Sequence, residues 1–167
     1  MWMQMITYGY LINPTTLSTY VFRDGAIAQP FTPLIGGIPL ASIILRLGKR
    51  ADRDTTGRFL TMQIVSGFNT PGQTTLLGQG IPAESLPGIL YDPATLQLIS
   101  PTTLGTATII LDTPITLAAG TPYAIILSDD DYYNQKRELG LDAMCFVTQI
   151  GTPGTPGGTT HIRTRTY

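Results

Sequence analysis

Apolar side chains alternate with period two along most of this sequence. Between residues 106 and 112, Ala107, Ile109 and Leu111 fall on one side, and Thr108 and Asp112 fall on the other. Such alternation is typical of a β-strand with one face in a core and the other face toward solvent. The pattern predicts further strands at residues 41–47, 58–64, 123–127 and 144–150, with weaker candidates at 19–23, 28–32, 74–77 and 160–166.

Turn signals separate these segments at short intervals. The chain holds 18 glycines and 13 prolines, many of them in pairs such as Gly36-Gly37 and Pro71-Gly72. Short strands without helical crossovers predict an all-β fold, an antiparallel jelly-roll-like β-sandwich with extended N- and C-terminal arms. Asp92-Pro93-Ala94 has the cap and first-position proline of a single helical turn.

The pattern also divides the chain and predicts its core. We expect an N-terminal arm or first strand at residues 1–28, a β-sandwich domain at 29–150, and a Gly/Pro-rich loop with a last strand at 151–167. The inward positions of the strands predict one inter-sheet core. Its expected members are Ile43, Leu45, Leu60, Met62, Ile109, Leu111, Ile125 and Leu127.

Charged residues make up only 13% of the chain, about half the usual share. The formal net charge of -1 gives no electrostatic reason to expect nucleic acid as a partner. Low charge also means weak self-repulsion, which favours a homo-oligomer. No apolar run approaches the ~20 residues of a membrane helix, and the uncharged N-terminal stretch is not expected to be a signal peptide.

Groups suited to catalysis are scarce. His161 is the only histidine and Cys145 the only cysteine, and no G-x-S-x-G turn supplies a serine nucleophile. The sequence therefore predicts that the chain is not an enzyme and has no catalytic residue, metal site or cofactor. Cys145 lies in the apolar run at residues 143–147, which favours a buried, inert thiol.

The two ends of the chain each allow two interpretations. Residues 1–12 contain no charged side chain and form either the first strand of the chain's own sheet or an apolar arm that binds a neighbouring subunit. The last residues form either a charged edge strand that resists aggregation or an arginine contact to an acidic partner. The partner-interface candidates are Trp2, Met3, Met5, Ile6, Tyr8, Tyr10, Leu11, Arg163, Arg165 and Tyr167.

Two clusters of polar residues in the sequence are further candidates for a functional site. Residues 129–134 form either a solvated loop tip or a site for a cation or a glycan, because carboxylates suit calcium and tyrosines stack on sugar rings. The candidate residues are Asp129, Asp131, Tyr132, Tyr133 and Asn134. The second cluster is basic but interrupted by Asp52 and Asp54, and predicts a charge-mixed hairpin tip. Its members are Arg46, Lys49, Arg50, Arg53 and Arg58.

From about residue 29 to residue 150 the order of motifs is similar to a β-sandwich family of phage virion proteins and exported bacterial proteins. The shared elements are Gln29-x-Phe31, the strand at 40–47, the turn at Gly57, the strand at 60–64, the loop Thr70-Pro71-Gly72, the stretch Pro114-x-x-Leu117-x-Ala119-Gly120-Thr121-Pro122-Tyr123-Ala124-Ile125, and Asp142-x-x-x-Phe146. The segments 1–28 and 151–167 are additions to this pattern.

This resemblance implies a structural virion protein, such as a phage capsid cement or decoration protein that bridges neighbouring subunits. The expected partners are the major capsid protein or other virion subunits, and the expected location is the virion, assembled in the host cytoplasm. The alternative is a carbohydrate-binding or host-attachment module with a glycan as its partner.

Overall fold

The computed structural model describes residues 18–22, 25–37, 39–92, 94–95, 97–100, 104–130, 144–150 and 161–164. Strands account for almost all regular structure in these ranges, together with one 3-10 turn, η2 (Ala83–Ser85). The strands are β1 (Ser18–Val21), β2 (Gly25–Phe31), β3 (Pro39–Leu45), β4 (Leu47–Arg50), β5 (Phe59–Ser66), β6 (Thr74–Pro82), β7 (Gly88–Asp92), β8 (Gln97–Ser100), β9 (Ala107–Thr116), β10 (Tyr123–Ser128), β11 (Phe146–Ile150) and β12 (His161–Thr164).

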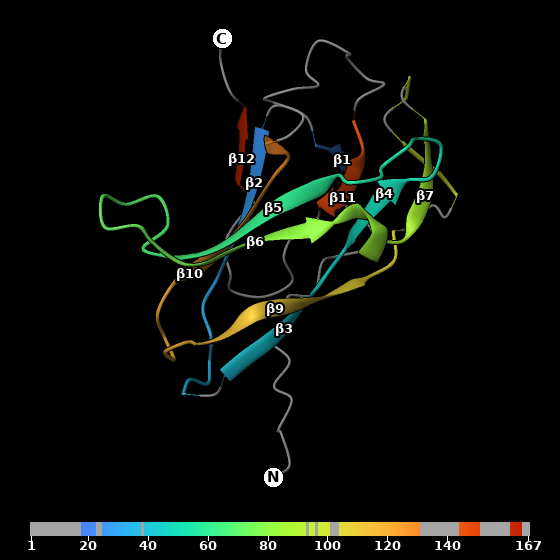
Figure 1. Ribbon diagram of the computed structural model, residues 1–167. Helices are drawn as coiled ribbons and strands as arrows, with labels where there is room; N and C mark the ends of the chain where they lie inside the picture. The colour runs from blue at the N-terminus through green and yellow to red at the C-terminus, as the bar shows by residue number, and fades with distance from the viewer. Residues whose placement is uncertain are drawn as a thin grey trace.

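The strands form three sheets (Figure 1). One five-stranded sheet has the order β1-β11-β4-β7-β8, a second has the order β12-β2-β10-β5-β6, and β3 pairs with β9 in a two-stranded sheet. All described pairs are antiparallel except β4 with β7, which is parallel. The prediction of an all-β sandwich built from antiparallel sheets is therefore confirmed, while the jelly-roll strand order stays a prediction.

One hydrophobic core receives side chains from all three sheets. Leu47 and Phe146 enter it from the first sheet, Leu60 and Met62 from the second, and Leu111 from β9. The alternation in β9 explains its register, because Ala107, Ile109 and Leu111 are buried whereas the residues between them are exposed. The eight residues expected in the core all belong to this cluster, with Ile43, Leu45 and Ile125 only partly buried at its margin.

The two-stranded sheet is joined to its neighbours in two ways. At one end, β3 stops at Leu45 and the chain continues almost directly into β4 of the first sheet. Along β9, the carboxamide of Gln79 in β6 takes the place of a missing backbone pair. Its Nε2 donates to the Ile110 carbonyl at 2.9 Å, and its Oε1 accepts from the Asp112 N–H at 3.0 Å. This side chain adds two polar contacts to the hydrophobic core that the second and third sheets share.

The structure differs from the sequence-based expectation at residues 87–100. No strand was expected there, yet β7 and β8 pair with each other. The predicted helical turn at Asp92 is wrong: the Asp92 Oδ1 accepts a hydrogen bond from the Ala94 N–H at 2.8 Å inside the turn that joins the two strands. An aspartate that caps a helix can equally close a turn, because the same side-chain oxygen serves both.

Strands near both ends of the chain join the sheets of the sandwich. β1 pairs with β11, and β12 pairs with β2, so neither lies apart from the central domain. The strand β2 itself runs across the predicted boundary between residues 28 and 29. The interface candidates in residues 1–12, together with Arg165 and Tyr167, lie outside the described residues, and only the backbone of Arg163 is described.

The adjacent residues Leu111 and Ile110 test the register of β9. Leu111 is 4% exposed in the core, and Ile110 is 69% exposed on the outer face. We expect Leu111→Ala to lower the free energy of unfolding by about 2–5 kcal/mol, because it leaves a cavity. Ile110→Ala should change it by about 0.5 kcal/mol or less. Urea titration of both variants at low protein concentration provides the measurement, and equal effects would contradict the register.

Candidate functional site

Most charged side chains of the described residues lie between residues 46 and 58. Within this group Arg50, at the end of β4, is 1% exposed. Its guanidinium donates to both carboxylate oxygens of Asp52, at 3.1 Å and 2.8 Å, and to the Met144 carbonyl at 3.4 Å. The guanidinium carbon also lies 5.2 Å from the centre of the Tyr91 ring, a favourable cation–π distance. Arg50 therefore connects β4, β7 and the start of β11.

A second buried arginine crosses between the two five-stranded sheets. The Nη2 of Arg58, just before β5, contacts the Asp129 carboxylate oxygens at 3.1 Å and 3.3 Å. Its Nη1 lies 3.2 Å from the Sγ of Cys145, just before β11. Asp129 is 1% exposed, so this ion pair is shielded from water. The pair neutralises two buried charges and fixes the end of β10 beside the start of β5.

These contacts correct two expectations. The basic cluster is not simply a solvated hairpin tip, because Arg50 and Arg58 turn inward to buried partners. The interpretation of residues 129–134 as a solvated tip is wrong for Asp129, whose carboxylate is already paired with Arg58. The remaining members of that candidate site, Asp131, Tyr132, Tyr133 and Asn134, lie outside the described residues. Burial of Cys145 is confirmed.

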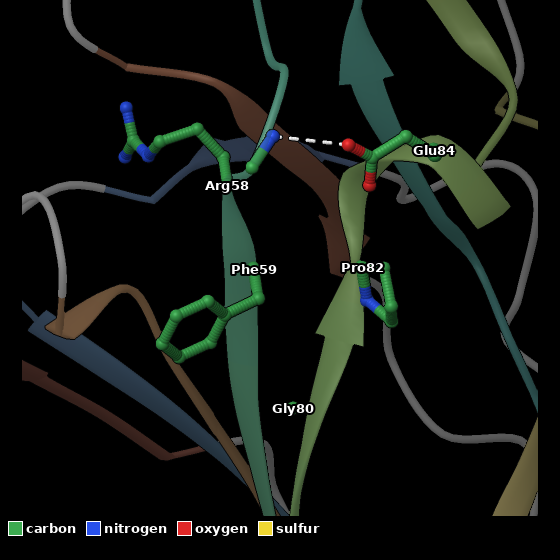
Figure 2. A pocket seen from close by; sticks show the side chains of 6 residues that line it. Arg58, Phe59, Gly80, Pro82 and Glu84 are labelled. Atoms are coloured by element: carbon green, nitrogen blue, oxygen red, sulfur yellow. Dashed lines mark hydrogen bonds between the residues drawn. The ribbon is translucent and has the colours of Figure 1, made fainter.

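A shallow, open hollow of about 410 Å³ lies over the start of β5 and the end of β6. Figure 2 shows the ring of Phe59 beside Gly80 and the Arg58 side chain directed away from Glu84. Phe59 is 48% exposed. A Cβ atom added at Gly80 would lie 3.3 Å from the ring, so the glycine provides the space that the aromatic side chain covers.

The carboxylate at the other side of this hollow is held in place. Glu84 lies in η2, and its Oε1 accepts a hydrogen bond from the Gly57 N–H at 3.0 Å (Figure 2). This bond is the main reason that the pKa of Glu84 is lowered. The hollow thus has an aromatic ring at one side and an oriented carboxylate at the other. The hollow is lined by Gly57, Arg58, Phe59, Gly80, Pro82 and Glu84.

The outer faces of the sheets combine apolar side chains with few charges. β3, β5, β6, β8 and β10 contain no charged residue at all. Apolar side chains on these strands and their neighbours are well exposed. They are Ile44 and Ile110 on β3–β9, Leu90 and Ile99 on β7–β8, and Phe59 and Leu76 on β5–β6. Leu34 and Ile35 are exposed in the loop before β3.

No group of three or more His, Cys, Asp and Glu side chains in the described part of the chain comes together in a way that could hold a metal ion. None of the described residues forms a helix with the length and apolar character needed to cross a bilayer.

The exposed apolar residues were not singled out from the sequence, although a signal for them was present. Phe59 precedes the inward series Leu60, Met62 and Ile64, so the period of two already assigns it to the outer face. Ile44 likewise falls between the inward residues of its strand. An apolar residue at an outward position of the period-two pattern indicates an exposed apolar side chain. Such a residue is easily assigned to the core, because most apolar residues of a strand are buried.

Comparison with protein-family models, with curated proteins and with solved structures found no match for this chain.

The buried ion pair predicts an asymmetric response to mutation. Asp129→Asn should lower the free energy of unfolding by about 3–5 kcal/mol, because it leaves the Arg58 charge buried without its counter-ion. The double variant Arg58→Met with Asp129→Leu should lose clearly less, since neither charge then remains. Chemical denaturation of both variants measures the difference. A single variant as stable as the unmodified protein would show that the pair does not stabilise the fold.

Asp52 predicts how stability depends on acid. The hydrogen bonds from Arg50 hold the pKa of Asp52 below its ordinary value of 3.8. A carboxyl with a lowered pKa stabilises the fold above its unfolded-state value, and this contribution disappears as the pH falls through the folded-state value. The free energy of unfolding should therefore decline below about pH 4. Asp52→Asn should be less stable at neutral pH and should show a smaller decline, measured by urea unfolding along a pH series. An unchanged decline in the variant would contradict this role.

Proposed function

We propose that this chain is a structural assembly protein, and specifically a cement or decoration protein that bridges neighbouring subunits of a phage capsid. The proposal rests chiefly on one observation, the outer faces of the sheets, which have few charges and expose isoleucine, leucine and phenylalanine side chains. Soluble proteins normally blunt exposed strands with charged side chains, especially lysine. Apolar faces without such protection are typical of surfaces that a protein partner covers.

The distribution of charge supports assembly in a second way. The two buried arginines serve internal contacts with Asp52 and Asp129, so they contribute little to the field at the surface. The formal net charge of the whole chain is -1. Long-range repulsion between copies is therefore weak, which permits close packing on a symmetric lattice. The absence of a basic surface excess gives no support to nucleic acid as the ligand.

The choice of a capsid among assemblies is supported by the sequence motifs similar to virion β-sandwiches, from Gln29 to Phe146. The uncharged segment 1–12 gives a means of attachment. Burial of an aromatic, Ile or Met side chain contributes roughly 1.5–3 kcal/mol. Several such side chains in one arm would secure attachment to a groove or strand edge of the major capsid protein after the costs of association are met.

A second candidate function, glycan binding, is favoured by the hollow between Phe59 and Glu84. The Phe59 ring there would supply the stacking surface for a sugar. Assembly is the stronger proposal because the apolar residues are spread over β3, β8 and β9 as well, far beyond a single hollow.

Particle binding tests the proposal. We expect the chain to sediment with capsids when a lysate of its source is separated on a density gradient, and to be visible on the particles by immunogold electron microscopy. A variant lacking residues 1–12 should keep its melting temperature and lose this attachment. Recovery of the chain only in the soluble fraction would contradict the capsid proposal. Glycan-array binding that Phe59→Ala abolishes and Leu76→Ala leaves intact would replace it with the second candidate.

A further inference from the structure

The strand β3 has an unpaired edge within the described part of the structure. It belongs to a two-stranded sheet and pairs there with β9 alone. In Figure 1, β3 lies on the outside of β9, away from β6. Backbone N–H and C=O groups along such an edge remain available to another strand. The first part of β3 is protected, because Pro39 has no N–H group and the register shifts between Leu40 and Ser42. Residues 42–45 have neither protection.

The inward side chains of this two-stranded sheet are less buried in β3 than in β9. Ile109 and Ala107 of β9 are fully buried, whereas their direct partners Ile43 and Leu45 in β3 are only half-buried, although they face the same core. On the opposite face, Ile44 is 56% exposed. Residues 43–45 thus leave apolar surface accessible on both faces of the strand. An additional strand beside β3 would complete the burial of the inward pair and cover the outward isoleucine.

We infer that the unpaired edge of β3 binds the β3 edge of a second copy of this chain, which joins the two small sheets into one continuous sheet. This inference rests on the proposed function, because it names one contact by which the assembly forms. The occupant must be apolar on both faces and uncharged, and β3 itself satisfies both conditions. Residues paired across an antiparallel ladder share a face, so a two-fold axis at Ile43 places Ser42 opposite Ile44 of the second copy.

The size of this contact sets its strength. One strand edge from each copy buries an area at or below the lower limit of about 1,200 Å² for stable protein interfaces. We therefore expect a dimer that forms at high concentration and dissociates on dilution. Weak pairing of this kind is suited to an assembly in which many equivalent contacts act together.

Sedimentation velocity over micromolar to millimolar concentrations tests the pairing. The unmodified chain should show a reversible monomer–dimer equilibrium. Ile44→Lys should raise the dissociation constant by about tenfold or more, because it replaces two apolar side chains at the junction by two ammonium groups that lie diagonally across the ladder on the same face and repel each other. Ile99→Lys is the matched control, since Ile99 is 58% exposed on β8, an edge strand of a different sheet, and should leave the equilibrium unchanged. Melting temperatures of both variants equal to that of the unmodified chain would show that folding is intact.

Disulfide trapping provides a test independent of the charge variants. Native Cys145 is buried, so new cysteines report the contact. A mixture of Ser42→Cys and Ile44→Cys chains should form a covalent dimer on mild oxidation, while a mixture of Thr108→Cys and Ile44→Cys chains should not, since Thr108 lies one strand inward on β9.

Different outcomes separate this inference from the proposed function. A chain that stays monomeric at every concentration, or a dimer broken by Ile99→Lys and kept by Ile44→Lys, would overturn the β3 pairing. A dimer lost only when residues 1–12 are removed would replace it with exchange of that segment.

Particle attachment that persists in Ile44→Lys while the dimer is lost would support the pairing and show that attachment uses another surface. Attachment that fails in the unmodified chain, with the dimer present, would overturn the capsid proposal alone.

Discussion

The Arg58 guanidinium is a buried charged group that contacts both five-stranded sheets of the fold. It contacts Asp129 at the end of the second sheet and the Cys145 sulfur at the start of a strand in the first. Hydrophobic burial alone would allow the sheets to slide over each other, because apolar contacts have little directionality. A charged group with fixed donor directions, buried where water cannot replace its partners, permits one alignment. Arg50 performs a similar task between β4 and β7 through Asp52 and Tyr91.

This use of charge explains an unusual feature of the chain. Few charged residues are present, and two of the arginines face inward, so the exposed positions in the described part of the chain are held mainly by threonine, glycine, proline and aliphatic residues. Such a surface has weak solvation and weak repulsion toward a similar surface. A small number of guanidinium groups therefore provides directional polar contacts inside the sandwich and leaves few charges on its surface.

The fold class and core were predictable from the sequence because both follow from local periodicity. Ile109 and Leu111 are two residues apart in a strand, and no distant residue is needed to assign them to the same face. The buried ion pair was not predictable in this way, since Arg58 and Asp129 are 71 positions apart and each has charged neighbours in sequence. β7 and β8 were not predicted from the sequence. Pro87 is typical of a turn and Asp92 of a helix cap, and these two residues interrupt the period-two pattern of the strands. For the candidate site, the interface predicted at residues 1–12 stays a prediction, and the sequence did not point to the edge of β3, because which strand lies at an edge is a property of topology.

The contact made by Gln79 restricts that position more than its place in an ordinary strand suggests. Its amide presents a donor to the Ile110 carbonyl and an acceptor to the Asp112 N–H in a fixed order. Asparagine is one methylene too short to keep both contacts, and glutamate offers oxygen at both places. Hydrolysis of the side-chain amide, a slow chemical change in ageing proteins, would set a carboxylate oxygen against a carbonyl oxygen. This contact between β6 and β9 would then be lost while the shared hydrophobic core stays in place, so the age of a protein preparation would weaken one polar link between the second and third sheets.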